Sequence, residues 1–159
     1  MRFKCNKKEP CVFCAECCRF REKTDFNEKE ELKIKKSLFS KTGTLYIYPL
    51  SRFTINITPQ EKEVLEEEAR KKGVKIDILP KKIFLSDKGI IIYDYFIDAD
   101  VCPFLTSENR CSIYEKRPLI CKQFPKIEYN NSEFENFEKE NKIVKVNYEK
   151  CLTYIMTKI

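Results

Sequence analysis

The 159-residue sequence contains no histidine and no long apolar run, and these absences exclude several kinds of protein. Without histidine, a metal site has no imidazole ligand and an enzyme lacks its commonest general acid–base. The longest aliphatic run, Ile90 to Ile92, is far shorter than the roughly 20 residues of a membrane span. The first ten residues include no apolar stretch that could form the core of a secretion signal. We therefore expect a soluble, cytoplasmic protein without a membrane partner.

The nine cysteines, by contrast, are grouped at the spacing of metal ligands. The first group is Cys11, Cys14, Cys17 and Cys18, the second is Cys102, Cys111 and Cys121, and Cys5 and Cys151 stand apart near the two ends. In the absence of imidazole, thiolates would hold a soft metal, which favours zinc or an iron–sulfur cluster. The alternative is a disulfide framework, which needs an oxidising compartment. Because no secretion signal is visible, we favour reduced, metal-bound cysteines.

Length and charge restrict the remaining possibilities. A chain of 159 residues with 42% hydrophobic content predicts one domain covering residues 1–159. The formal net charge of +6 counts every cysteine as neutral. A four-thiolate zinc site or an oxidised four-iron cluster carries about −2, so two such sites would leave roughly +2. We therefore do not expect a nucleic-acid partner.

Helix signals are clear in two places. One helix is predicted to begin at Pro59, after the cap Thr58, and to end before Gly73. Another is predicted over about 28–39, after the cap Asn27.

Strand patterns and one less regular helix complete the prediction. Strands are predicted over 44–57 (with a break near Pro49), 74–79, 83–85, 90–97 and 142–146, and residues 111–122 are predicted to be mostly helical. These elements indicate a small α+β domain, with a few helices and a short antiparallel sheet around a cysteine-ligated metal centre. The two cysteine groups, 84 residues apart, are expected to meet in space.

The first cysteine group is too long for one compact site on a straight helix. All four thiols would fall within an arc of roughly 120°, but their axial spread would be about 10 Å. Either the segment coils around a metal as a loop, or its thiols are divided between two sites. The spacing from Cys11 to Cys17 matches the first three ligands of a bacterial ferredoxin run, whose fourth cysteine precedes proline, as in Cys102-Pro103. A zinc ribbon would show a second Cys-x-x-Cys pair, which is missing.

A longer pattern in the sequence consists of Cys11-x-x-Cys14-x-x-Cys17-Cys18, Cys102-Pro103-Phe104-Leu105, Cys111-Ser112-Ile113-Tyr114, Arg117-Pro118 and Cys121-Lys122-Gln123-Phe124-Pro125. This combination resembles the YkgJ-type cysteine-cluster family, described as a zinc- or iron-chelating domain and distantly similar to flagellin lysine N-methylases. The resemblance implies that the seven cysteines of the two blocks, 11–18 and 102–125, are metal ligands.

Two further site residues are candidates. Eight cysteines fill two four-ligand sites, so we assign Cys151 as the eighth ligand and leave Cys5 out. Arg117 could donate hydrogen bonds to the sulfur of a cluster and raise its potential. The alternative for Arg117 is a surface ion pair.

Three functions are compatible with these residues. The first is an iron–sulfur protein, with a cluster of the 4Fe–4S type, that relays electrons or handles clusters for a protein partner. The second is a zinc-stabilised protein-interaction module. The third, a protein-modifying enzyme related to the methylases, is disfavoured because histidine and any recognisable nucleotide or cofactor loop are missing. We assign no catalytic residue.

Overall fold

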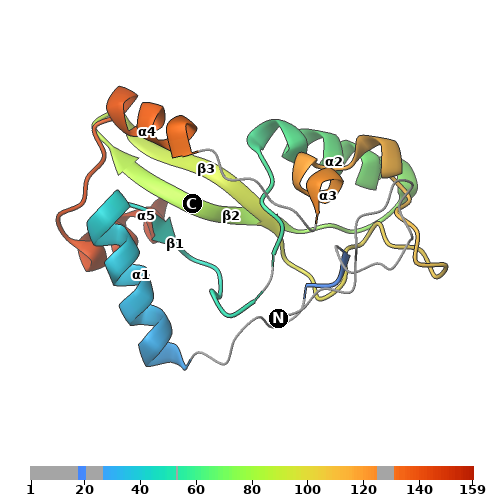
Figure 1. Ribbon diagram of the computed structural model, residues 1–159, viewed down its shortest axis with the longest axis horizontal. Coiled ribbons are helices and arrows are strands. Elements are labelled where there is room, and N and C mark those ends of the chain that lie inside the picture. The colour runs from blue at the N-terminus through green and yellow to red at the C-terminus, as the bar shows by residue number, and fades with distance from the viewer. Residues whose placement is uncertain (1–17, 21–26, 53, 125–130) are drawn as a thin grey trace. The chain divides into compact units, whose positions relative to one another are not determined.

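The computed structural model describes residues 18–20, 27–52, 54–124 and 131–159 (Figure 1). These residues form five α-helices and an antiparallel sheet with the strand order β1–β2–β3, which confirms the predicted α+β class. Within this part of the chain, none of the helices has the length and apolar character that crossing a membrane requires. The chain divides into two compact units, which are described separately. A single domain over residues 1–159 stays a prediction.

The first unit draws its described residues from Met1–Thr24, Arg52–Leu79 and Tyr95–Glu128. Its main helix, α2 (Pro59–Lys72), begins and ends where the sequence predicts. The Thr58 side chain accepts from the Glu61 amide at 3.1 Å, and the Glu61 carboxylate accepts from the Thr58 amide at 3.0 Å. This reciprocal capping box satisfies two amides that the helix leaves without partners. Gly73, with a φ of 64°, ends the helix in the left-handed conformation.

The segment 111–122, predicted to be mostly helical, is helical in two short pieces. The segment forms a 3-10 helix, η2 (Tyr114–Lys116), and a five-residue helix, α3 (Leu119–Gln123). Arg117, at φ −59° and ψ 147°, separates them. The residue before a proline is disfavoured in the helical region, so Pro118 accounts for the break.

The core of the first unit is formed by buried apolar side chains from all three of its chain segments. Its members are Cys18, Phe20, Ile55, Ile57, Leu65, Ala69, Ile97, Cys102, Phe104, Ile113 and Phe124. Two of the predicted metal ligands therefore belong to this core.

β2 (Ile78–Ser86) and β3 (Gly89–Ile97) form a hairpin (Figure 1). The chain passes from the first unit to the second within β2, after Leu79, and back within β3, after Asp94. The strands predicted over 74–79 and 83–85 are instead one continuous strand that begins at Ile78. Lys82 interrupts the apolar pattern, but its polar groups are satisfied: its amide donates to the Asp94 carboxylate at 3.1 Å and its ammonium lies 3.2 Å from the same side chain.

The second unit draws its residues from Asp25–Ser51, Pro80–Asp94 and Tyr129–Ile159. It contains α1 (Glu28–Thr42), β1 (Leu45–Tyr46), α4 (Asn131–Glu140) and α5 (Tyr148–Lys158). Asn27 caps α1 as predicted, with its side chain accepting from the Glu30 amide.

Two predicted strands are present only as short pairings between a few residues. Among the described residues of the predicted strand 44–57, Leu45 and Tyr46 alone form a strand, because they alone pair with β2. Ile57 makes one isolated bridge, to Tyr95. The predicted strand 142–146 is likewise reduced to a bridge between Ile143 and Ser86.

Candidate metal centre

A short antiparallel ladder joins the end of the first cysteine group to the start of the second. The amide of Cys102 donates to the carbonyl of Cys18 at 2.7 Å, and the amide of Phe20 donates to the carbonyl of Asp100 at 2.8 Å. Between them, Arg19 and Val101 form a bridge. The two cysteine side chains are buried, with 7% and 9% of their surface exposed. The two groups therefore meet, as expected, at Cys18 and Cys102.

Arg52 donates hydrogen bonds to both segments of this ladder, the one around Phe20 and the one around Asp100. Its guanidinium donates to the carbonyl of Phe20 at 3.3 Å and to the carbonyl of Ala99 at 2.7 Å, and it pairs with the carboxylate of Asp100. A guanidinium suits this role because its five N–H groups form a rigid fork. Sequence reasoning missed Arg52, since nothing local in the sequence marks a residue whose partners lie 32 to 48 positions away.

A tight loop brings Cys111 back towards Cys102. The amide of Leu105 donates to the carbonyl of Cys102 at 3.0 Å, and Leu105 forms an antiparallel bridge with Cys111. The loop turns at Asn109, which has a φ of 60°. Asparagine tolerates this left-handed conformation better than most residues, so Asn109 was a usable turn signal that the sequence prediction did not include.

Cys121 is carried by α3, and its amide donates to the carbonyl of Pro118 at 3.0 Å. The preceding Arg117 is held by Tyr114. Its Nε donates to the Tyr114 carbonyl at 2.8 Å, and its guanidinium carbon lies 3.7 Å from the centre of the Tyr114 ring. This combines a hydrogen bond with a cation–π contact. A hydrogen bond from Arg117 to cluster sulfur stays a prediction.

Four of the predicted ligands line one cavity of about 40 Å³ in the first unit: Cys18, Cys102, Cys111 and Cys121. The other lining residues are Ile55, Leu65, Ile97, Phe104, Asn109, Ile113, Tyr114, Arg117 and Pro118. The cavity exceeds the roughly 10–15 Å³ that one water molecule needs. Its described walls contain no carboxylate, so its donor set is one of soft thiols in a mainly apolar setting.

The donor chemistry fits zinc or an iron–sulfur cluster, both of which are bound by cysteine thiolates. Among the described residues, however, no group of three cysteine or carboxylate side chains is arranged to hold a metal ion. No disulfide joins any two of the five cysteines that the structure describes. Cys11, Cys14 and Cys17, like Cys5, lie outside the described residues, so their part in the site stays a prediction.

Cys151 belongs to the second unit, where it lies on α5. Its side chain is 6% exposed and packs in a core with Phe39, Leu45 and Ile155. This is the usual environment of a cysteine that acts as a small apolar residue. A role for Cys151 as a metal ligand stays a prediction.

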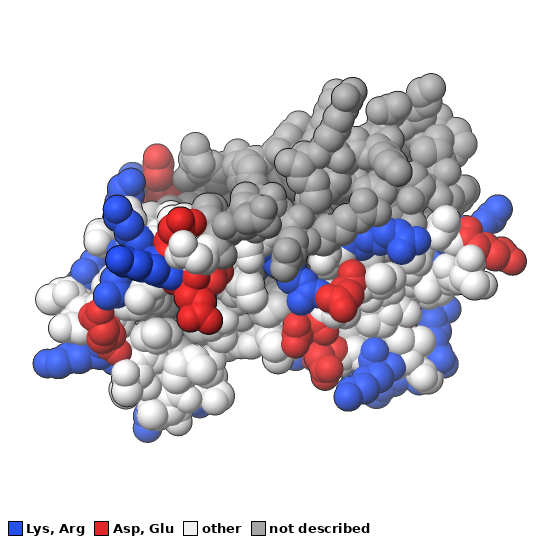
Figure 2. Space-filling view, turned by 90° about the horizontal axis from the view of Figure 1, so that it is seen from below, with Lys and Arg blue, Asp and Glu red and all other residues white. Residues whose placement is uncertain are grey.

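Charged side chains of both signs are interspersed over the described residues on the face seen in Figure 2. The mixture agrees with a formal net charge of only +6 from 31 basic and 25 acidic residues. Proteins that bind nucleic-acid backbones usually gather their lysine and arginine residues on one face. The expectation about nucleic acid nevertheless rests on the sequence.

Comparison with protein families matches residues 10–152 to the CxxCxxCC family, whose description is "Putative zinc- or iron-chelating domain". The chain belongs to this family. Membership in the CxxCxxCC family confirms the cysteine-cluster resemblance and supports metal binding by the chain. No curated protein and no solved structure gives a significant match.

Proposed function

We propose that this CxxCxxCC protein binds an iron–sulfur cluster of the 4Fe–4S type and uses it to relay electrons or to handle clusters for a protein partner. The observation that carries the proposal is the convergence of Cys18, Cys102, Cys111 and Cys121 on one largely apolar cavity. Iron–sulfur clusters are held by cysteine thiolates, and their potentials depend on hydrogen bonds and solvent exposure. Cys11, Cys14 and Cys17, whose spacing matches a ferredoxin run, would supply further ligands, and with Cys151 the eight cysteines would fill two four-ligand sites.

A structural zinc site is the second candidate. It is favoured by the number of described thiols at the cavity, since four cysteines are a common zinc ligand set. It is also favoured by the position of Cys18 and Cys102 in the core of the first unit, where metal binding would contribute directly to folding. In this case the protein would be an interaction module for a protein partner.

Purification of the full chain without oxygen tests the proposal. We expect brown protein that contains iron and acid-labile sulfide. Cys102→Ser should lose most of both, because Cys102 lies at the cavity, whereas Cys5→Ser should lose neither. Colourless protein with stoichiometric zinc and no sulfide would replace the iron–sulfur proposal by the zinc one. Unchanged metal content in Cys102→Ser would contradict a metal site at this cavity.

The eighth ligand is tested separately with Cys151→Ser. A pair of four-ligand sites requires Cys151, so the metal content per chain should fall. If Cys151→Ser keeps its full metal content, Cys151 is a core residue of the second unit and the count of two sites is wrong.

A further inference from the structure

The segment between Cys111 and Cys121 has little regular structure of its own. Its helices, η2 and α3, contain three and five residues, and neither has a side-chain cap at its N-terminus. Isolated helices this short are unstable in water, because nucleation is costly. The positions of the cysteines at its two ends therefore depend on contacts with other elements.

Helix α2 supplies two of these contacts from one face. The ammonium of Lys116 lies 2.7 Å from the carboxylate of Glu68, and the amide of Leu119 donates to the carboxylate of Glu61 at 2.6 Å. Glu61, Leu65 and Glu68 are four and three residues apart, a spacing that places them on one helix face. Leu65 is itself a wall of the cysteine cavity. The same face of α2 thus lines the cavity and holds the segment that carries two of its thiols.

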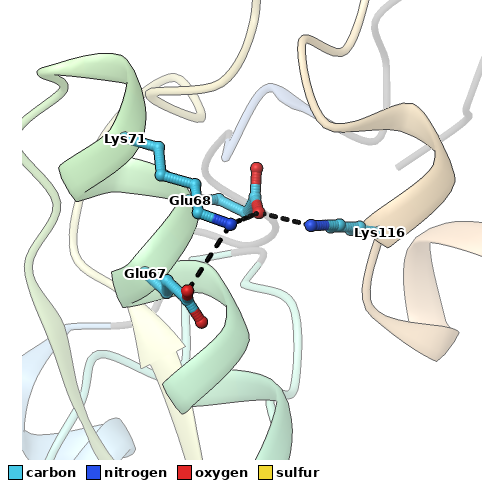
Figure 3. Close-up of polar contacts among 4 residues, drawn as sticks. All are labelled: Glu67, Glu68, Lys71 and Lys116. Carbon is cyan, nitrogen blue, oxygen red and sulfur yellow. Dashed lines mark hydrogen bonds and ion pairs between the residues drawn. The ribbon is translucent and has the colours of Figure 1, made fainter.

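Glu68 is the more buried partner, with 10% of its side-chain surface exposed. The hydrogen bond from Lys116 is the main reason that the pKa of Glu68 lies below its ordinary value, and the same bond raises the pKa of Lys116. Both groups are therefore charged at neutral pH. Lys71 also approaches Glu68, at 3.5 Å, but it lies on α2 itself, whereas Lys116 reaches in from the other segment (Figure 3).

We propose that Glu68 and Lys116 form a positioning pair for the metal centre. The pair holds the segment from Cys111 to Cys121 against α2, so that its two thiols reach the same metal site as Cys18 and Cys102. This inference rests on the proposed metal binding, with either zinc or an iron–sulfur cluster as the bound group. Lys116 acts through the position of the thiolates, because neither it nor Glu68 lines the cavity.

The two lysines that contact Glu68 provide a matched experiment. Lys116→Met and Lys71→Met each remove one positive charge beside Glu68, but only Lys116→Met breaks a link to the cysteine segment. The reduced, metal-free full chain is titrated with Zn²⁺ in competition with a chromophoric chelator. We expect Lys116→Met to bind Zn²⁺ about tenfold more weakly, as for substitutions of residues that support metal ligands. Lys71→Met should match the wild type, and Lys116→Arg should restore most of the affinity.

Titration with Co²⁺ separates positioning from general stability. Thiolate-to-cobalt charge-transfer absorption per bound ion reports how many thiolates reach the metal. This absorption per bound Co²⁺ ion should be lower in Lys116→Met than in the wild type and unchanged in Lys71→Met. If Lys116→Met does not fold, as judged by circular dichroism, Glu68→Gln takes its place. The expected loss is smaller, about threefold, because the amide oxygen can still accept from the Lys116 ammonium but no longer carries the opposite charge.

The outcomes distinguish the two proposals. Equal Zn²⁺ affinity and equal Co²⁺ absorption in Lys116→Met and Lys71→Met would overturn the positioning role while leaving metal binding intact. Unchanged Zn²⁺ affinity in Glu68→Gln would likewise overturn the positioning role. Wild-type protein that binds neither ion would overturn the positioning role, because there would be no thiolate site for the pair to position, whereas the iron–sulfur proposal is refuted by the absence of iron and sulfide from the full chain purified without oxygen.

Discussion

Replacement of Arg52 by methionine should loosen the ladder that brings Cys18 beside Cys102. The substitution keeps a long apolar side chain but removes three interactions of the guanidinium: with the Phe20 carbonyl, the Ala99 carbonyl and the Asp100 carboxylate. Two of these acceptors are backbone groups from the two different segments of the ladder.

The three interactions contribute unequally. The Asp100 side chain is 94% exposed, and exposed ion pairs contribute only about 0–1 kcal/mol. Each of the two hydrogen bonds to a carbonyl should contribute about 1 kcal/mol, with the shorter one, at 2.7 Å to Ala99, contributing more. We therefore expect Arg52→Met to lower the free energy of unfolding by about 2 kcal/mol.

Urea denaturation followed by circular dichroism measures this loss, and metal content per chain measures its effect on the site. Asp100→Asn is the control, because it removes only the exposed ion pair and should lower the free energy of unfolding by less than about 1 kcal/mol. Arg52→Met should also retain less metal than Asp100→Asn. If the two variants are equally stable and hold equal metal, the bonds from Arg52 to the backbone do not support the site.

Two further predictions concern a glycine and a carboxylate. Gly43→Ala should lower the free energy of unfolding, measured by urea denaturation, by about 2–4 kcal/mol, because Gly43 has a φ of 75° and the added Cβ would collide with Ile143. The control Gly73→Ala, at a φ of 64° with open space around it, should lower it by only about 1 kcal/mol. Equal losses in the two variants would exclude the collision. Glu68 should titrate below its ordinary pKa of 4.5 when its carboxyl carbon is followed by NMR, and Lys116→Met should raise that pKa, because the desolvation of Glu68 then has less to oppose it. Because the pKa of Glu68 is lower in the folded chain than in the unfolded chain, the pair stabilises the fold fully above about pH 4.5, and this contribution is lost as the pH falls through the pKa of the folded chain. If Lys116→Met leaves the pKa of Glu68 unchanged, the pairing is contradicted.

Features set by neighbouring residues could be predicted from the sequence. The limits of α2 depend on Thr58, Glu61 and Gly73, which lie within a turn of the helix ends. The cysteine spacing likewise identified the family, and four of the cysteines that it marks line one cavity. In both cases the decisive residues form a local pattern whose physical meaning does not depend on the rest of the fold.

Features set by distant partners could not be predicted. The pattern over residues 44–57 favours a strand with a break near Pro49, but a strand needs a partner, and of the described residues in this range only Leu45 and Tyr46 pair with β2. Arg52 looks like any charged residue until the ladder between residues 18–20 and 100–102 is known. The pair of Glu68 and Lys116 is separated by 48 positions, and surface lysines far from a carboxylate in sequence give no sign of such a pairing.

The assembly of the cavity from separated stretches of chain affects how the protein emerges from the ribosome. Cys18 is synthesised about a hundred residues before Cys121, and at 5–20 residues per second this interval lasts roughly 5–20 s. For most of this interval Cys18 lacks the segment that pairs with it, because Cys102 has not yet been translated. The nascent chain thus exposes thiols to its surroundings before it can bury them. Metal loading should therefore follow the release of α3 from the ribosome, and oxidants present during synthesis should be more damaging than oxidants added to the finished protein.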